Sequence, residues 1–135
     1  MKKYNIGITF GAFEIFHIGH LNIIKNAKKQ CHKLIVCVST DEYIYKKKKH
    51  KSVTLLEDRL SIIKSIKYVD IVDIQSLTFG KKEAIKKYKP EVIFVGNDWT
   101  PKTFTGANLG IPVVYLPRTQ GISSTKIRKR LLSEE

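Results

Sequence analysis

The sequence predicts an α/β fold, in which one Rossmann-like domain over residues 1–135 carries a five-stranded parallel sheet with helices on both faces. Three observations predict it. Short apolar runs alternate along the chain with segments of helical period. The run KLIVCVS at 33–39 is apolar almost throughout, as is typical of a strand covered on both faces. The length of 135 residues is also near the commonest domain size.

The expected elements follow in order along the chain. Apolar runs indicate five strands, at 4–10, 33–39, 69–74, 91–95 and 112–116. Helical spacing indicates helices at about 18–30, around Leu56, Leu60, Ile63 and Ile66, at about 80–89 and at about 123–132. No internal repeat or linker interrupts this order.

The stretch 40–53 is polar and very basic, with KKKKHK at 46–51, and we interpret it as a loop. In open parallel sheets, ligands bind beyond the carboxyl ends of the strands, where the strand order reverses. We therefore expect a ligand site among the loops that follow the first, fourth and fifth strands.

The charge balance favours anionic ligands. The 25 Lys and Arg residues against 12 Asp and Glu give a net charge of +13, which attracts nucleotides, phosphorylated small molecules and nucleic acid alike. No apolar run approaches the roughly 18 residues that cross a bilayer, and the N-terminus MKKYNIGITF lacks a secretory signal. We expect a cytoplasmic protein without membrane insertion. Of its two cysteines, Cys37 is expected in the core.

The loop after the first strand, GAFEIFHIGH at 11–20, holds the sharpest functional signal. His17 and His20 are three residues apart where the helical period begins, so both imidazoles lie on one side of the first turn. That turn also offers unpaired N–H groups and the positive end of the helix dipole. Gly19 has no side chain, so a phosphate can approach the backbone closely. These features predict an anion-binding cradle.

Two motifs at opposite ends of the chain carry a resemblance to a known superfamily. HIGH at 17–20 matches the HxGH signature of nucleotidyltransferases, and RTQGISST at 118–125 is similar to the RTxGIS[ST]T motif of their cytidylyltransferase family. The sequence most resembles the glycerol-3-phosphate cytidylyltransferases, over nearly its full length, including STDE at 39–42, YVD at 68–70 and GxDW at 96–99. An HxGH motif alone would be weak, but the two motifs in the right order, in a chain of the right length, are specific to the family.

The resemblance implies an activity. Such enzymes transfer a cytidylyl group from CTP to a phosphorylated small alcohol, most closely glycerol 3-phosphate here, giving CDP-glycerol and pyrophosphate. It also implies Mg²⁺ that bridges substrate phosphates rather than a metal site built by the protein. A homodimer and a role in cell wall or capsule precursors are implied by the same resemblance.

The resemblance also assigns residues to the site. The residues expected to be catalytic, by stabilising charge on the phosphates, are His17, His20, Arg118 and Lys47. Nucleotide contacts are expected from Ala12, Phe13, His17, Gly19, His20, Lys49, Asp98, Arg118, Thr119, Gly121, Ile122, Ser123, Ser124 and Thr125. The acceptor phosphate is expected at Lys47, Lys81 and Arg59.

Several of these residues also have simpler explanations. Arg59 is in mid-helix and either points into the site or pairs on the surface. Ser123 is a good N-cap for the last helix whether or not it binds phosphate. Asp98 either accepts hydrogen bonds from ribose hydroxyls or helps to hold a metal, and a Gly-Asn-Asp turn with a half-buried Trp99 would explain the same residues. Lysines such as those at 46–51 are usually solvated, and one extra residue between them and Arg59 leaves open a shift by one in the assignment of Lys47 and Lys49.

Four positions depart from the family pattern. The usual Gly-[Thr/Cys]-Phe-Asp is here Gly11-Ala12-Phe13-Glu14, so position 12 loses a hydroxyl or thiol and the carboxylate at 14 reaches further. The GDDW motif has a neutral Asn97, and Lys67 stands where an arginine with a bidentate fork is common. These changes leave nucleotidyl transfer intact and the acceptor open.

Two other classes of function remain. One is an enzyme of the same fold with another substrate pair, such as phosphoethanolamine with CTP, a heptose phosphate with ATP, or FMN with ATP. The other is a nucleic-acid-binding module, which the net charge of +13 would suit. The aromatic residues are not interleaved with the basic ones as a base-stacking platform needs, so we expect no nucleic-acid partner.

Overall fold

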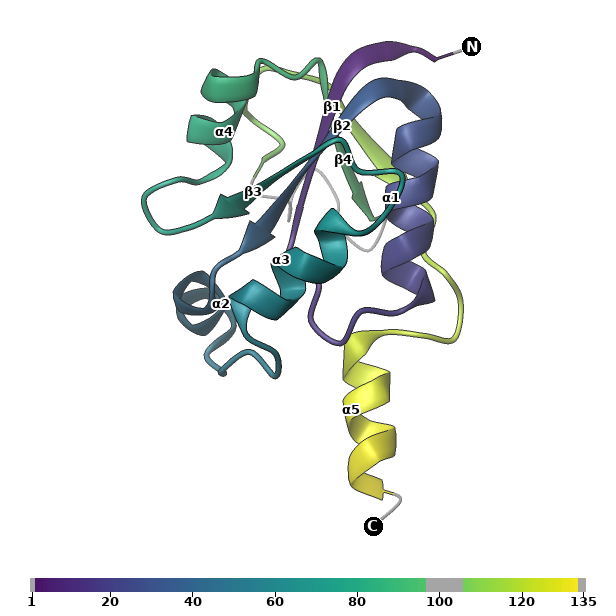
Figure 1. Ribbon diagram of the computed structural model, residues 1–135, viewed down its shortest axis with the longest axis vertical. Helices are drawn as coiled ribbons and strands as arrows, with labels where there is room; N and C mark the ends of the chain where they lie inside the picture. The colour runs from purple at the N-terminus through teal and green to yellow at the C-terminus, as the bar shows by residue number, and fades with distance from the viewer. Residues whose placement is uncertain (1, 97–105, 134–135) are drawn as a thin grey trace.

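The computed structural model describes residues 2–96 and 106–133. Within them, a five-stranded sheet in the order β3-β2-β1-β4-β5 is parallel throughout. The strands are β1 (Tyr4–Gly11), β2 (Cys31–Ser39), β3 (Ile71–Gln75), β4 (Val92–Gly96) and β5 (Val113–Leu116). The helices are α1 (Ile18–Gln30), α2 (Asp41–Lys48), α3 (Leu56–Lys64), α4 (Lys81–Tyr88) and α5 (Ser124–Ser133). The predicted α/β class is confirmed (Figure 1).

The strand order reverses beside the central strand. The chain runs from β1 to β2 and β3 on one side, then places β4 and β5 on the other. Gly7, Ile8 and Thr9 of β1 therefore pair with both β2 and β4. Because the two connections diverge here, a crevice is expected at the carboxyl ends of β1 and β4.

Both faces of the sheet are covered, and β2 shows why its sequence is apolar. Leu34, Val36 and Val38 point to the face under α1 and α3, whereas Ile35 and Cys37 point to the face under α4. All five side chains are at most 1% exposed. A strand buried on both faces needs an apolar residue at every position rather than at every second one.

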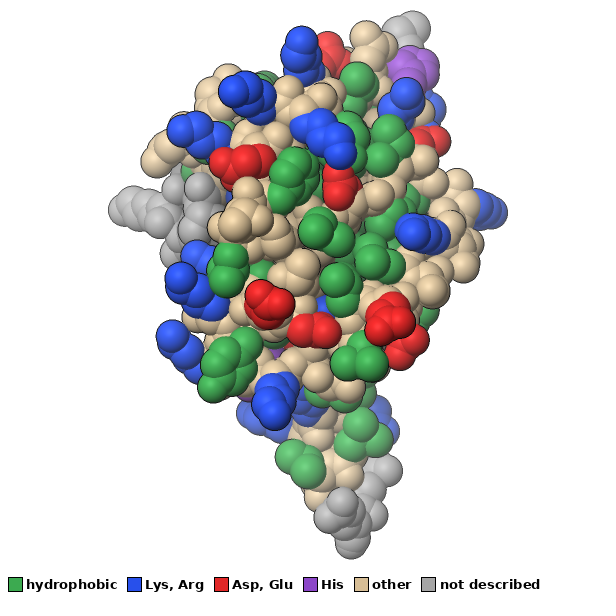
Figure 2. All heavy atoms as spheres, turned by 60° about the vertical axis from the view of Figure 1, so that its left-hand side comes forward, with side chains coloured by type: hydrophobic (Ala, Val, Ile, Leu, Met, Phe, Trp, Pro, Cys, Tyr) green, Lys and Arg blue, Asp and Glu red, His purple; other side chains and the backbone are tan. Residues whose placement is uncertain are grey.

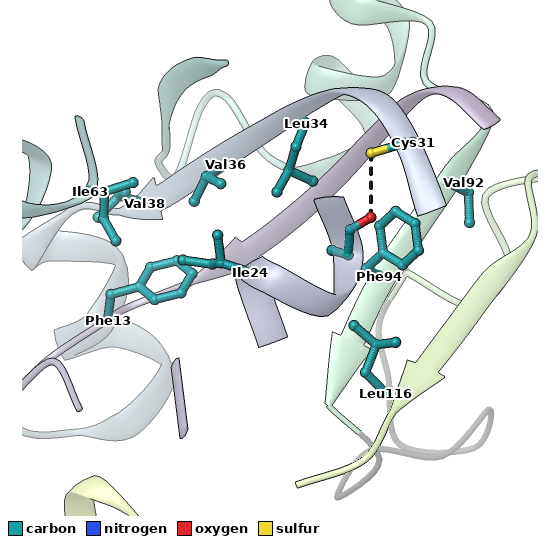
Figure 3. Packing of buried hydrophobic residues seen from close by; sticks show 11 residues of the cluster. Phe13, Ile24, Cys31, Leu34, Val36, Val38, Ile63, Val92, Phe94 and Leu116 are labelled. Atoms are coloured by element: carbon teal, nitrogen blue, oxygen red, sulfur yellow. Dashed lines mark hydrogen bonds between the residues drawn. The ribbon is translucent and has the colours of Figure 1, made fainter. Parts of the chain in front are cut away.

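The cluster under α1 and α3 joins distant parts of the chain. Figure 3 shows Ile24 of α1 and Ile63 of α3 on the same side of the sheet as the apolar residues of β2, with Leu116 of β5 in the same cluster. Phe13, from the loop after β1, inserts its ring into this cluster and is 8% exposed. The loop that carries the HIGH motif is thus anchored to the core.

The interpretation of 40–53 as a loop is wrong for its first half, which is α2. The Thr40 hydroxyl caps this helix by accepting the Tyr43 N–H at 3.1 Å. Ile44 is 1% exposed and fixes one face of the helix to the body. Lys49 ends the helix with a left-handed φ of 63°. A cap and one apolar anchor, rather than an apolar stripe, therefore make this basic segment helical.

Helix α5 differs from the other helices in its surroundings. None of its residues is buried, and it projects away from the body at the opposite end from the N-terminus (Figure 1). Basic side chains are spread over the face shown in Figure 2, with the same projection at its lower end. Among residues 2–96 and 106–133, no helix is long and apolar enough to span a bilayer.

Candidate active site

A cavity of about 570 Å³ opens at the carboxyl edge of the sheet. Its walls come from both ends of the chain: the β1–α1 loop and His20, α2, the start of α4, and the first turns of α5. Residues predicted for the site that line it are Ala12, Phe13, His20, Lys47, Lys81, Ser124 and Thr125. The topology therefore brings the two sequence motifs to the place where ligands bind in sheets of this kind.

The HIGH motif forms the N-terminus of α1. His17 is the N-cap, and its Nδ1 accepts the Gly19 N–H at 3.0 Å. The Nδ1 of His20 accepts the His17 N–H at 3.3 Å, which completes a capping box. Because each Nδ1 accepts, the proton of each neutral ring is on Nε2, which leaves an N–H donor on both imidazoles.

Gly19 is required by this arrangement. A Cβ at position 19 would lie 2.7 Å from Cε1 of His17 and 3.6 Å from Cγ2 of Ile122. The space that a side chain would fill therefore belongs to the His17 ring, a reason for glycine that adds to the expected approach of a phosphate. The neighbouring Ile122 also shows that the RTQGISST segment lies against the start of α1.

His20 is held in a cluster of rings. Its ring stacks on His17 at 3.9 Å between centroids and on Phe16 at 5.3 Å, and meets Phe13 edge-on at 5.5 Å. Burial, with smaller contributions from the charges of His17 and Lys48, lowers the pKa of His20 to about 4. Burial also lowers the pKa of His17. These lowered pKa values favour the neutral form of both rings, in which each Nε2–H can donate a hydrogen bond. Of the two, only His20 lines the described part of the cavity.

Lysines from two helices form the cationic wall. Lys47 and Lys48 of α2 line the cavity on the face that also carries Tyr43 and Ile44. Lys81 is the first residue of α4, with Nζ 5.3 Å from the Phe10 ring centroid. Burial, aided by the positive charge of Lys47, lowers the pKa of Lys81 to about 8.

Lys49 is not brought to the cavity. It lies beyond the end of α2 and lines a second, separate groove with Tyr45, Leu55 and Leu77. Lys48, one residue earlier, lines the cavity where Lys49 was expected. The sequence left open which lysines of 46–51 act, because a loop gives no face to its residues, whereas a helix puts 43, 44, 47 and 48 together.

Arg59 is buried, so the alternative of a surface pair is wrong. It is 1% exposed, and it donates to the carbonyls of Thr54, Ala12 and Ser39 and pairs with Asp41. These bonds tie α3 to α2 and to the loop after β1. Four of the five guanidinium donors are thereby used within the chain. Contact between Arg59 and the acceptor phosphate stays a prediction.

The second motif meets the first in space. Thr119 Oγ1 accepts from Asn22 Nδ2 of α1 at 2.8 Å. Ser123 caps α5 by accepting the Lys126 N–H at 3.1 Å, and Gly121 turns the chain with a φ of 80°. Ser124 Oγ donates to the Glu14 carbonyl at 2.9 Å. The expected junction of the two chain ends is therefore present.

Other predicted residues of this motif do not line the cavity, and some lie outside the description. Arg118 is exposed, Thr119 bonds to Asn22, Gly121 turns the chain and Ser123 caps α5. Contacts of Arg118, Thr119, Gly121, Ile122 and Ser123 with the nucleotide stay predictions. Asp98 and Trp99 fall in 97–105, outside the described residues. No motif singled out Arg128, whose position four residues after Ser124 puts it on the cavity side of α5.

Comparison with known proteins decides the family. Residues 8–130 match the model of a family described as Cytidylyltransferase-like. The chain belongs to this family. Glycerol-3-phosphate cytidylyltransferase of Bacillus subtilis is 39% identical over 131 residues, which are 97% of this chain and 98% of that protein. FAD synthase of Pyrococcus abyssi is 34% identical over 92% of this chain and 90% of that protein.

The solved structures agree on the fold. A lipopolysaccharide core biosynthesis protein of Thermoplasma volcanium superposes with a TM-score of 0.70 over 86% of this chain and 97% of its own, at 24% identity. Membership of the cytidylyltransferase-like family makes the protein a nucleotidyltransferase. Its cavity suits that chemistry, because lysines, neutral N–H donors and a helix N-terminus converge where negative charge gathers on phosphates.

Proposed function

We propose that the protein transfers a cytidylyl group from CTP to glycerol 3-phosphate, giving CDP-glycerol and pyrophosphate. The observation that carries this proposal is the single cavity lined by residues from both chain ends, with His20 on one side and Ser124 and Thr125 on the other. The motif RTQGISST and the 39% identity to a glycerol-3-phosphate cytidylyltransferase over nearly the whole chain support cytidylyl transfer.

The proposed reaction is an in-line displacement. An oxygen of the acceptor phosphate forms a bond to the α-phosphorus of CTP, the bond from that phosphorus to the bridging oxygen breaks, and pyrophosphate leaves with the electron pair. A phosphate monoester is already anionic near neutral pH, so no strong general base is needed. The barrier comes from repulsion between two anions and from charge on the leaving group, which preorganised donors reduce.

The charged groups divide the cavity into two parts. The charge of Lys48 helps to lower the pKa of His20, and we place both residues on the nucleotide side of the cavity, together with α5. The charge of Lys47 helps to lower the pKa of Lys81, and these two lysines would attract the acceptor phosphate. His17 and His20 would donate through Nε2–H to the CTP phosphates, and Arg118, Ser123, Ser124 and Thr125 with the α5 N-terminus to the β- and γ-phosphates.

Magnesium is proposed as a companion of the substrate. Within 2–96 and 106–133, no group of three His, Cys, Asp or Glu residues could hold a metal ion. Glu14 is the one acidic side chain in the described cavity lining, and it is paired with Arg128. This donor set fits a cation carried by phosphate oxygens rather than a protein cage. When bound, Mg²⁺ would neutralise charge on the triphosphate.

A second acceptor and nucleotide pair is favoured by one observation. The related FAD synthase is 34% identical over 92% of this chain, so FMN with ATP is the alternative. The methyl group of Ala12 and the longer carboxylate of Glu14 lie in the cavity wall, where they bear on substrate choice.

Pyrophosphate release tests the proposal. CTP and ATP are each offered with glycerol 3-phosphate, other phosphorylated alcohols, phosphoethanolamine and FMN. Release only with CTP and glycerol 3-phosphate supports the proposal, and release only with ATP and FMN overturns it. DNA binding that falls steeply with salt, without any nucleotide-dependent release, would instead indicate a nucleic-acid-binding module.

Three finer proposals rest on the family resemblance. The protein acts as a homodimer, works in the cytoplasm, and supplies precursors of a cell wall or capsule polymer. Sedimentation of the purified chain tests the first of these, with a monomer at micromolar concentration as the contrary result.

A further inference from the structure

One buried carboxylate joins the two chain ends at the cavity. Glu14 is 3% exposed, and its Oε2 accepts from Nη2 of Arg128 on α5. Its backbone carbonyl accepts from Ser124 Oγ at 2.9 Å. Ser124 and Arg128 are four residues apart, so both contacts lie on one face of α5. A single residue of the β1–α1 loop therefore holds α5 at two points.

Helix α5 has little apolar anchorage of its own, with Ile127 only half-buried. None of its residues is buried, and Leu131 and Leu132 near its end are 64% and 71% exposed. Its position therefore depends on polar contacts. The two contacts to Glu14 are on the cavity side, where Ser124, Thr125 and Arg128 form part of the lining.

The loop around Glu14 carries the marks of a functional arrangement. Oε1 of Glu14 is buried without a hydrogen-bond partner among the residues that the structure describes, although buried polar groups nearly always have one. Phe13 and Ile15, on either side, have φ of 55° and 48°, in the left-handed region that side chains rarely adopt. Strain and incomplete pairing in the wall of a site point to a functional role for the segment.

We propose that the Glu14–Arg128 pair is a latch that positions α5 over the cavity, so that its N-terminus, Ser124 and Thr125 meet the triphosphate already oriented. This inference rests on the proposed function in one respect, that α5 binds the nucleotide phosphates. Glu14 and Arg128 are positioning residues, because they act through α5 and not on the reacting atoms. The side chain of Glu14, longer than the aspartate of the family pattern, gives the carboxylate the reach to α5.

The latch predicts a selective effect. When it is broken, α5 is docked in only a fraction of molecules, and the apparent dissociation constant for the triphosphate rises by the inverse of that fraction. A docked fraction of about one tenth gives a rise of about tenfold. The KM for the acceptor changes little, because Lys47 and Lys81 are on α2 and α4 and do not depend on α5.

The experiment compares four variants of the full chain. They are Glu14→Gln, Arg128→Met, the double variant, and Lys129→Met, which removes the same charge from an exposed position of the same helix. Binding of inorganic tripolyphosphate is measured by calorimetry, hydrogen exchange of the α5 amides is followed without ligand, and KM is measured for nucleotide and acceptor separately.

The expected result is weaker tripolyphosphate binding by about tenfold and faster α5 exchange in both single variants, no further loss in the double variant, and no change in Lys129→Met. Additive losses, or unchanged α5 exchange in Arg128→Met, would overturn the latch. Arg128 is on a projecting helix, so this variant decides the question even where Glu14→Gln fails to fold. The tripolyphosphate and exchange measurements use no CTP and no acceptor, so a different substrate pair would leave them intact.

Discussion

The two chain ends that meet at the cavity are built in opposite ways. At the N-terminal end, His20 is enclosed by the rings of His17, Phe16 and Phe13, and Phe13 reaches into the core. At the C-terminal end, α5 has no buried residue and is held by polar contacts. One site therefore combines a donor fixed by packing with a helix that is held by a few bonds.

This difference suggests that the packed N-terminal end and the exposed helix α5 have different roles in the site. Segments with few buried contacts open at a lower free energy than packed ones. Donors on the packed side cost no reorganisation during the reaction, which suits charge stabilisation in the transition state. The exposed side is expected to open more readily than the packed one. Substitutions at the first side are expected to lower turnover, and those at the second to weaken nucleotide binding.

The largest effect is expected at the packed histidines. His20→Ala or His17→Ala removes an N–H donor to the phosphates, and loss of one such donor costs on the order of 10²–10³ in kcat. Thermal unfolding is expected to change little. Steady-state pyrophosphate release measures the effect, with His32→Ala as the control because His32 is exposed and away from the cavity. Near-normal turnover in His20→Ala would remove the role given to that ring.

A smaller loss is expected when His17 is moved rather than removed. Gly19→Ala places a Cβ 2.7 Å from the His17 ring and must displace it, and such displacement lowers kcat by roughly ten- to a hundredfold. Gly121→Ala is the matched glycine of the other end: its φ of 80° strains the turn, but nothing lies within 4 Å of the new Cβ. We expect Gly121→Ala to lower stability by about 1 kcal/mol and kcat much less than Gly19→Ala. An equal loss of kcat in the two variants would contradict the different roles given to the two chain ends.

A pH dependence is expected at Lys81, with the smallest effect. Its pKa is lowered to about 8 by burial and by Lys47, so its positive charge is lost as pH rises through 8. The KM of the acceptor should then rise several-fold between pH 7 and 9, while that of the nucleotide changes less. Lys81→Met should abolish this rise, and Lys82→Met, at the exposed neighbour, should retain it. An identical pH profile in wild type and Lys81→Met would contradict the assignment.

The same lowered pKa predicts a change in stability. Between pH 8 and the ordinary lysine pKa of 10.5, the unfolded chain keeps the proton that folded Lys81 has lost. Because the unfolded state binds more protons there, the free energy of unfolding contributed by Lys81 rises with pH across that window. Urea unfolding of wild type and Lys81→Met at pH 7.5 and 9.5 measures it; a contribution that falls over the window has the wrong sign.

The fold followed from periodicity because its sheet is buried on both faces. The run at 33–39 is apolar at nearly every position since Leu34 and Ile35 face opposite clusters. Helix α2 escaped prediction because it is stabilised by the Thr40 cap and the single buried residue Ile44. One capping threonine and one apolar residue do not form a helical pattern that can be recognised in a segment composed mostly of lysines.

The arrangement of the site could be predicted where a short motif lies on one helical turn. It could not be predicted where the contact depends on helix register or joins residues far apart in the sequence. His17, Gly19 and His20 are adjacent on one helical turn, so their arrangement follows from spacing. Lys48 and Lys49 differ by one position, and only the register of α2 decides which faces the cavity. The pairing of Glu14 with Arg128 joins residues 114 positions apart, and local sequence contains nothing that specifies it.

The central claim, that both chain ends bind one triphosphate, is tested most directly by NMR. Amide signals of the isotope-labelled chain are followed as CTP is added. The account predicts that the amides of Gly19 and His20 and those of Ser124 and Thr125 shift together, with one dissociation constant. Shifts at only one of the two ends, or two different dissociation constants, would contradict it.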